Sequence, residues 1–191
     1  MNKHKQLKFT VFAALLTSIS VVLKLFLGIT VDMFGGLVKD INLSPTTIMF
    51  SGMMLGPVYG GLVGALTDIL VYIVRPLGSY NPIFTITNAL MGILPALFFL
   101  KSQKHSLLRI SLSTAFTQIL CSFIINTLTL ILMGFLPAQI AWFRALSTFI
   151  MLPIHIFLIY TLAKASDRYL PFLRINKNTG ATVYTNEESM V

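Results

Sequence analysis

Residues 56–90 read GPVYGGLVGALTDILVYIVRPLGSYNPIFTITNAL, two apolar runs joined by a short polar segment. Between positions 75 and 90 the chain places one arginine, two prolines, one glycine, one tyrosine and two asparagines. Pro76 and Gly78 break helices, so the two runs predict two helices and the residues between them predict a turn. The stretch therefore predicts neighbouring helices with polar side chains gathered where they meet.

The composition predicts a membrane protein. Of the 191 residues, 55% are hydrophobic and 10% are charged, whereas about 25% of the residues of a soluble domain are charged. Several apolar runs approach the ~20 residues that cross a bilayer as a helix. The second and third are short, and we expect them to line something inside the protein, because irregular backbone at membrane depth needs protein or a water-filled cavity around it. We expect an all-α membrane protein, a bundle of six transmembrane helices near residues 9–28, 43–58, 60–75, 83–100, 107–133 and 138–163.

Basic residues predict the orientation in the membrane. The formal charge of +8 is concentrated at the ends of spans, which marks cytoplasmic segments and argues against nucleic-acid binding. Because six spans bring both ends of the chain to one side, we expect cytoplasmic N and C termini in a multi-pass protein of the cell membrane. The basic residues in question are Lys3, Lys5, Lys8, Lys101, Lys104, Arg109, Lys164, Arg168, Arg174 and Lys177.

The chain divides into one membrane domain and a tail. Residues 1–170 form the expected six-helix domain, and residues 171–191 lose the apolar pattern, which predicts a disordered cytoplasmic end. The outer connection 29–42 is long enough to act as a lid, although its Asp32 and Asp40 are equally consistent with ordinary solvated charges.

Small residues recur at helical spacing in two spans. Gly56, Gly60 and Gly64 follow one another at intervals of four, so one helix face carries almost no bulk and a second backbone can approach it closely. Such a face is consistent with packing inside the bundle or with docking of another protein's helix. The first span holds two pairs of small residues one turn apart, Ala13 with Thr17 and Ala14 with Ser18.

Charged residues inside spans need a reason, because a charge at the bilayer centre costs about 2.5–3.5 kcal/mol on insertion scales. Lys24, near the outer end of the first span, can extend its amine to the interface. Asp68 and Arg75 share one helix face with Tyr72 between them, which favours a polar ligand, a partner charge or a neighbouring helix. Arg144, near the outer end of the last span, favours binding of a carboxylate by its guanidinium group.

The polar segment also predicts a ligand site at the mouth of the bundle. A planar heteroaromatic molecule with a carboxylate would use stacking for its ring, amide hydrogen bonds for its edge and a cation for its acid. Trp142 is typical of the aromatic belt at a membrane interface. The segment supplies these groups through Arg75, Tyr80, Phe84, Thr85 and Asn88.

Enzyme motifs are absent from the sequence. His4 and His105 fall in cytoplasmic segments, and His155 and Cys121 each stand alone within a span, so we expect no catalytic residue, metal or cofactor. A phosphate-binding glycine loop is also missing, which means that the chain by itself does not hydrolyse ATP.

Three stretches together carry a family resemblance: LGPVYGGLVGALTDIL, RPLGSYNPIFTITNALMGILPAL and WFRALSTFIMLPIHI. They resemble the substrate-binding S component of energy-coupling factor vitamin transporters, and within it the folate-specific family, over about residues 7–165. The loop of that family reads Gly-x-Tyr-x-Pro-Gly-Phe-Thr, and this chain has Ile83 in place of the second glycine. The residues that match the loop are Gly78, Tyr80, Pro82, Phe84 and Thr85.

The resemblance implies a protein that captures a vitamin at the outer face of the membrane. It would then associate, within membrane lipid, with a transmembrane coupling protein and two cytoplasmic ATPase subunits, and topple to carry the site inward. Docking would use the small residues of the first span, Ala13, Ala14, Thr17 and Ser18.

For folate as the vitamin, the resemblance implies a role for each candidate residue. Arg144, supported by Lys24 or Arg75, would pair with a glutamate carboxylate, and the pterin edge would bond Asp68 or Asn88. Stacking surface would come from Tyr80, Phe84 and Trp142.

Three alternatives stay open from the sequence. The chain could be an S component for another vitamin, such as pantothenate or riboflavin. It could instead be a small membrane-embedded enzyme acting on lipid, or a subunit without a ligand in which Arg144 and Asp68 neutralise each other.

Overall fold

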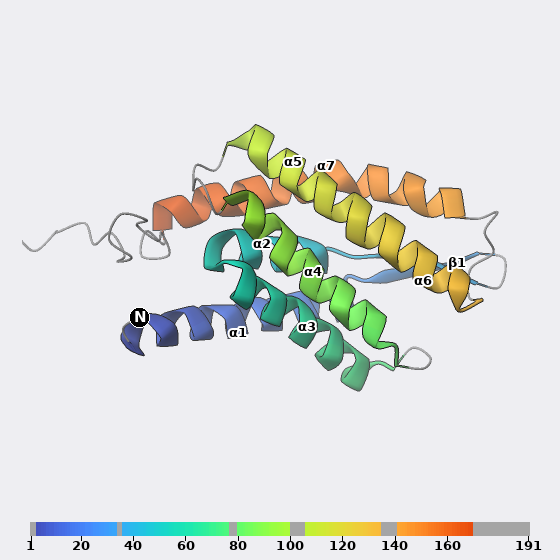
Figure 1. Cartoon of the computed structure of the whole chain (residues 1–191), viewed down its shortest axis with the longest axis horizontal. Helices are drawn as coiled ribbons and strands as arrows, with labels where there is room; N and C mark the ends of the chain where they lie inside the picture. The colour runs from blue at the N-terminus through green and yellow to red at the C-terminus, as the bar shows by residue number, and fades with distance from the viewer. Residues whose placement is uncertain (1–2, 34–35, 77–79, 100–105, 135–140, 170–191) are drawn as a thin grey trace, which may run out of the picture.

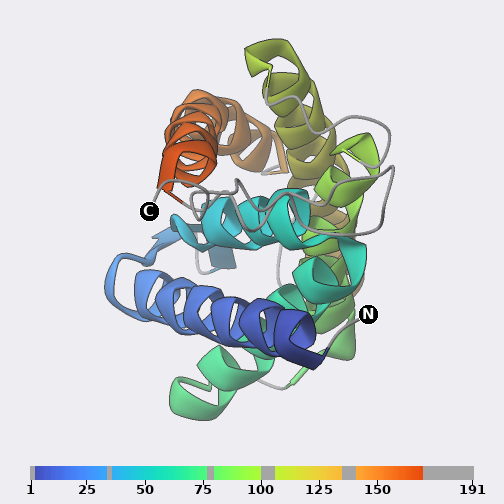
Figure 2. The same cartoon turned by 90° about the vertical axis from the view of Figure 1, so that its left-hand side faces the viewer.

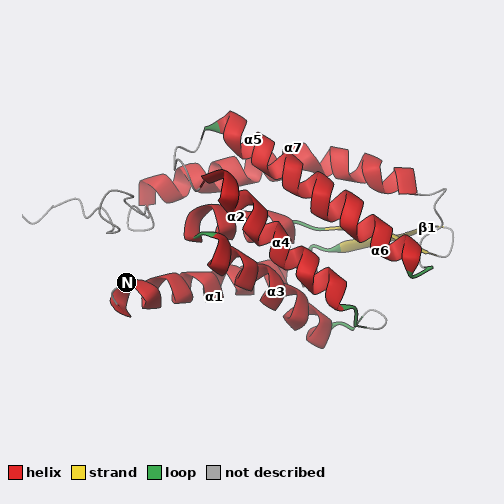
Figure 3. Ribbon diagram, in the orientation of Figure 1, coloured by secondary structure: helices red, strands yellow, loops and turns green. Residues whose placement is uncertain are grey.

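The computed structural model describes residues 3–33, 36–76, 80–99, 106–134 and 141–169, and within them helices dominate (Figure 3). Two short strands join the first two helices. The strands are β1 (Ile29–Met33) and β2 (Gly36–Ile41). The helices are α1 (Lys3–Phe26), α2 (Ser44–Leu55), α3 (Pro57–Val74), α4 (Pro82–Phe99), α5 (Leu107–Thr117), η1 (Gln118–Ile125), α6 (Asn126–Leu132) and α7 (Ala141–Tyr169).

The described residues form the expected bundle of six helical segments, because α5, the π-helical turns of η1, and α6 follow one another without a break. Five segments are long and apolar enough to cross a membrane: α1, α3, α4, the α5–η1–α6 rod and α7. The second expected span, 43–58, is the exception. Its helix α2 has 12 residues, roughly 18 Å of helix, which is too short for a hydrocarbon core of about 30 Å.

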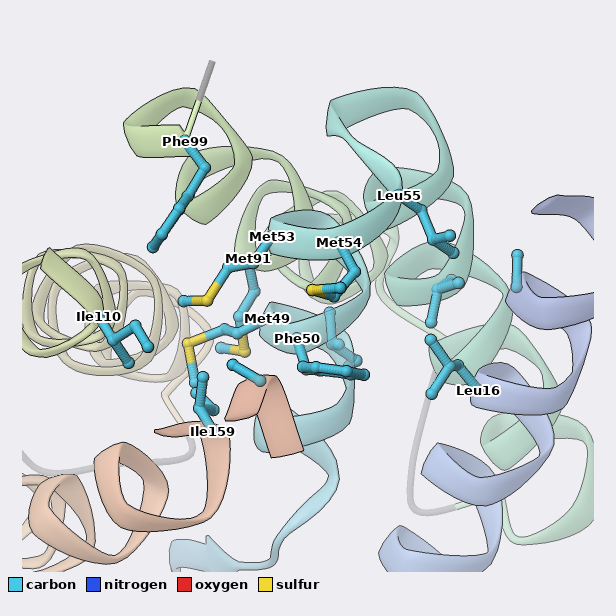
Figure 4. Close-up of a cluster of buried hydrophobic side chains, with 14 of the residues drawn as sticks. Leu16, Met49, Phe50, Met53, Met54, Leu55, Met91, Phe99, Ile110 and Ile159 are labelled. Atoms are coloured by element: carbon cyan, nitrogen blue, oxygen red, sulfur yellow. The ribbon is translucent and has the colours of Figure 1, made fainter. Parts of the chain in front are cut away.

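Helix α2 lies in the middle of the bundle, between α1 and α7 (Figure 2), and also contacts α3 and α4. Every residue of α2 except Pro45 is buried, since the helix is apolar or small on all sides and meets a neighbour on each. Met49 lies beside Ile159 of α7, while Leu55 lies on the side of Leu16 of α1 (Figure 4). The short second span therefore forms the core of the bundle.

Glycines allow α2, α3 and α4 to pack with their backbones in contact. A Cβ on Gly60 would lie 2.5 Å from the Cα of Gly52 and 2.6 Å from the carbonyl oxygen of Gly92. A Cβ on Gly64 would overlap the Asn88 carbonyl. At Gly56 a φ of 92° makes the turn between α2 and α3, a conformation that glycine adopts without penalty. Packing inside the bundle is thus the role of the glycine-rich face.

The connection 29–42 contains a β-hairpin that the sequence analysis did not predict. Strands β1 and β2 pair antiparallel, with Ile29 opposite Ile41, and an irregularity in register follows Val31. The all-α prediction holds for the bundle, and the hairpin is an addition at one end of it (Figure 1). The side chains of Asp32 and Asp40 lie outside the described residues, so the lid interpretation stays a prediction.

Both ends of the helical domain lie on the same side of the molecule. The N-terminus and the last turns of α7 are at the end opposite the hairpin (Figure 1). This agrees with an even number of helical segments. The expected tail, 171–191, lies outside the described residues.

Candidate functional site

Polar side chains from three helices meet toward the hairpin end of the bundle. Lys24 lies near the end of α1, Asp68 in the second half of α3, and Thr85 and Asn88 in the first two turns of α4. Because α3 and α4 are consecutive and antiparallel, the end of one lies beside the start of the other, and α1 packs against α3. The fold thus joins four of the residues that the sequence singled out.

Asp68 is the centre of this group. Its Oδ1 accepts a hydrogen bond from Lys24 Nζ at 3.2 Å and another from Asn88 Nδ2 at 2.8 Å, and its Oδ2 accepts one from the Thr85 hydroxyl at 2.8 Å. The Lys24 contact is an ion pair, with the lysine side chain 20% and the aspartate 12% exposed. The partner charge and the contact with a neighbouring helix that were considered for Asp68 are both present, and its role toward a polar ligand stays a prediction.

The direction of the hydrogen bonds follows from the number of protons. The Thr85 hydroxyl has one proton and donates it to Asp68, so the Tyr80 hydroxyl, 2.8 Å away, must donate to Thr85. A carboxylate has about four acceptor positions. The three described donors therefore leave one acceptor position, on Oδ2 of Asp68, for a further donor.

An aromatic pair lies beside the polar group. The rings of Tyr72 and Tyr80 are 5.1 Å apart between centroids and inclined by 57°. Tyr80 is 45% exposed, whereas Tyr72 is more buried. Tyr72 is absent from the predicted site residues, although its position one turn after Asp68 on α3 was the signal that could have added it.

The start of α4 is fixed by Asn81 and Asn88. The Asn81 side-chain oxygen accepts a hydrogen bond from the backbone N–H of Ile83 at 2.9 Å, which closes a turn at the start of the helix. Its amide contacts the sulfur of Met133 at 2.8 Å, so the turn is also joined to the end of α6. Asn88 donates a second bond to the Phe84 carbonyl at 3.1 Å, which holds its amide toward Asp68.

The remaining predicted site residues are not part of this group in the described structure. Arg75 ends α3 and is exposed, and Phe84 is half-buried on α4. Trp142 and Arg144 belong to the first turn of α7, but their side chains lie outside the described residues. Their predicted roles stay predictions.

The two small pairs of the first span face different ways. Ala13 and Thr17 are buried inside the bundle, and the Thr17 hydroxyl bonds the Ala13 carbonyl. Ala14 and Ser18 are exposed, with the Ser18 hydroxyl on the Ala14 carbonyl. Only Ala14 and Ser18 are thus placed to meet a partner helix without rearrangement of the bundle.

Comparison with known proteins assigns the fold to a family. The family described as "ECF transporter, substrate-specific component" matches residues 8–170. The folate transporter FolT of Clostridium novyi (strain NT) is 30% identical over 165 residues, which cover 86% of this chain and 92% of that protein. The crystal structure of FolT bound with folic acid is 26% identical and has a TM-score of 0.70, covering 86% of this chain and 94% of the other.

These similarities extend over the whole helical bundle. The family match begins in α1 and ends just after α7, so it includes every residue of the Asp68 group. The chain belongs to the family of substrate-specific components of ECF transporters.

Proposed function

We propose that this chain is a folate-binding S component, which captures folate at the outer face of the cell membrane. It then delivers folate by association with a coupling protein and two ATPase subunits, the partners general to its family. The observation that carries the proposal is the Asp68 group, where a carboxylate with one open acceptor position lies beside an aromatic pair. The likeness to a FolT structure containing folic acid supports the choice of vitamin.

The chemistry of folate suits this group. The edge of a pterin ring carries an amino group and ring N–H donors, and the open position on Asp68 Oδ2 accepts one of them. Tyr80, exposed above the group and in contact with Tyr72, offers a face for stacking. Lys24 is bound to Asp68, so we assign the glutamate carboxylates of folate to Arg144 with support from Arg75.

Binding and release, without a chemical change in the vitamin, is the activity we infer for the chain. The family is a transporter component, and an aspartate that is paired with a lysine and keeps one acceptor position open is suited to recognition. A membrane-embedded enzyme would need a second group positioned to exchange protons with a substrate. We accordingly assign no catalytic residue.

The test is a titration of the purified protein in detergent, following the fluorescence of Trp142, the single tryptophan of the chain. Folate is expected to quench it saturably at submicromolar concentration, while riboflavin and pantothenate, added in parallel with absorbance corrections, leave it unchanged. Calorimetry in the same buffer detects binding even if Trp142 is too far from the ligand for its fluorescence to change. Saturation by riboflavin or pantothenate instead of folate would assign the chain to another vitamin, and no binding of any of the three would refute the proposal.

A further inference from the structure

The face of α5 and η1 that points into the bundle is polar, although the bundle lies in a membrane. Ser113, Thr114 and Thr117 are fully buried, and Gln118 is 3% exposed. Cys121, one turn further along, is also fully buried. Polar side chains at membrane depth normally pair with one another, bond backbone carbonyls or line a hydrated cavity.

The hydroxyls of this face do not bond in the way that other helix threonines of the chain do. Thr17, Thr67 and Thr87 each donate to the carbonyl four residues earlier, at 2.7–2.9 Å. By contrast, among the described residues the hydroxyls of Ser113, Thr114 and Thr117 have no hydrogen-bond partner. Three buried hydroxyls within five residues of one helix thus need hydrogen-bond partners other than the described protein groups.

The same face meets a polar group on α7. The side-chain nitrogen of Gln118 is hydrogen-bonded to Nδ1 of His155, and both residues are 3% exposed. Gln118 is also the first residue of the π-helical segment η1. Such wide turns within helices occur frequently at functional sites.

A fourth hydroxyl comes from α2 at a similar depth. Helices α2 and α7 both start at the hairpin end of the bundle (Figure 1), and Met49 lies beside Ile159 (Figure 4). Thr46 precedes Met49 by about one turn, as His155 precedes Ile159. Thr46 is buried, and its hydroxyl too has no partner among the described residues.

We propose that these groups bind water molecules in a polar layer at the middle of the bundle, between α2, α5–η1 and α7. Leaving a hydroxyl unpaired in an apolar interior is unfavourable, and a buried water typically makes about three hydrogen bonds to otherwise unsatisfied groups. Thr114 and Thr117 on α5, with the adjacent Gln118 that bonds His155 of α7, supply that number of partners. The ligand is water because small hydroxyls and a neutral amide, without a charged side chain, suit a small neutral donor and acceptor.

X-ray hydroxyl-radical footprinting tests the proposal on the full-length protein in detergent. Radiolysis of a bound water produces the radical inside the bundle, where it oxidises Cys121, whereas radicals from bulk water do not reach this fully buried thiol. We expect rapid oxidation of Cys121. In the variant Thr114→Val/Thr117→Val, which keeps the side-chain shape and removes both hydroxyls, we expect Cys121 to lose most of this reactivity.

Two controls separate bound water from a loosened fold. Thr17→Val removes a buried hydroxyl that is bonded to a backbone carbonyl, and should leave oxidation of Cys121 unchanged. Thr114→Ser/Thr117→Ser restores the hydroxyls and should restore the oxidation. An unreactive Cys121 in the natural protein, or equal oxidation rates with threonine and valine, would overturn the proposal.

Discussion

At the scale of single residues, the ion pair of Lys24 and Asp68 decides the character of the candidate site. An exposed ion pair contributes about 0–1 kcal/mol to stability because solvent screens it. This pair is partly shielded, and Asp68 has two further donors. Removing one partner therefore costs more than the pair itself contributes, since it leaves a poorly hydrated charge and several unsatisfied donors.

The substitution Asp68→Asn tests this group. We expect unfolding of the protein in detergent to become easier by about 1–3 kcal/mol, the usual cost of an unsatisfied buried polar group, and folate binding to weaken. The double variant Asp68→Asn/Lys24→Met should lose less free energy of unfolding than the sum of the losses in the two single variants, because the two residues are in contact. Thermal unfolding of all four proteins gives the coupling energy, and strict additivity would contradict the network.

The substitution Arg144→Ala tests the assigned carboxylate contact. Loss of a charge-assisted hydrogen bond of about 1.5–3 kcal/mol corresponds to weakening of folate binding by more than about tenfold. Arg144→Lys keeps the charge without the planar group, so its folate affinity should lie between those of the natural protein and Arg144→Ala. Calorimetric titration measures each affinity. If Arg144→Ala bound folate as tightly as the natural protein does, this residue would not belong to the site.

At the scale of elements, the crossing of α3 with α2 and α4 depends on glycine. The backbones approach so closely at Gly60 and Gly64 that a Cβ would meet main-chain atoms, which have no rotamer to change. This crossing also fixes the candidate site. Asp68 lies one turn after Gly64, and the backbone carbonyl that Gly64 faces is that of Asn88, whose side chain bonds Asp68. Packing and the binding geometry are therefore coupled at one contact.

A single methyl group tests the crossing. We expect Gly64→Ala to lower the free energy of unfolding by about 1–3 kcal/mol, the usual cost of overfilling a packed core. Gly61→Ala is the matched control, since its Cβ would lie 3.0 Å from the Ile93 side chain, which can move, and at an ordinary 3.8 Å from the nearest backbone atom, the Ala89 carbonyl oxygen. Equal melting temperatures for the two variants would show that α3 and α4 can separate without cost.

At the scale of the whole molecule, the Asp68 group lies toward the hairpin end of the bundle, whereas α1 begins and α7 ends at the other end (Figure 1). Four basic residues with described side chains, Lys8, Arg109, Lys164 and Arg168, lie near helix ends on the side where α1 begins and α7 ends, whereas two, Lys24 and Arg75, lie toward the other end. Since positive charge marks the cytoplasmic side of membrane proteins, we infer that the Asp68 group faces outward before transport.

Cysteine labelling tests this orientation. Because Cys121 is the single cysteine and is fully buried, an impermeant maleimide should not react with the natural protein in intact cells. We expect Tyr80→Cys to react from outside and Ser106→Cys, at the start of α5, to react only after permeabilisation. The reverse pattern would invert the topology.

Docking to the coupling protein is tested on the outer face of α1. Ser18→Leu fills the small surface formed with Ala14, and we expect it to reduce co-purification with the coupling protein while folate affinity is kept. Thr161→Leu is the control, because Thr161 is likewise exposed and bonds a carbonyl one turn earlier, on α7. Equal loss in both variants, or in neither, would contradict docking through Ala14 and Ser18.

The sequence by itself determined the class of the protein and most of its helices. Apolar runs of membrane length are a local property, so α1, α3, α4, the α5–η1–α6 rod and α7 could be predicted from it. Charged residues inside spans, such as Asp68 and Lys24, could also be recognised as candidate site residues from the sequence, because a charge at membrane depth is costly unless it is paired. The family resemblance rested on the same local stretches.

Tertiary structure alone decided which of these residues meet. Lys24 and Asp68 are 44 positions apart, and the periodicity of so apolar a bundle does not specify which helix faces are adjacent. Helix α2 could be recognised as a core helix, and Ala13 distinguished from Ala14, only once the neighbouring helices were placed. The physical reason is that lipid is as apolar as the helix surfaces, so hydrophobicity does not select which helix faces meet. Backbone contact at glycines and pairing of polar groups select one arrangement.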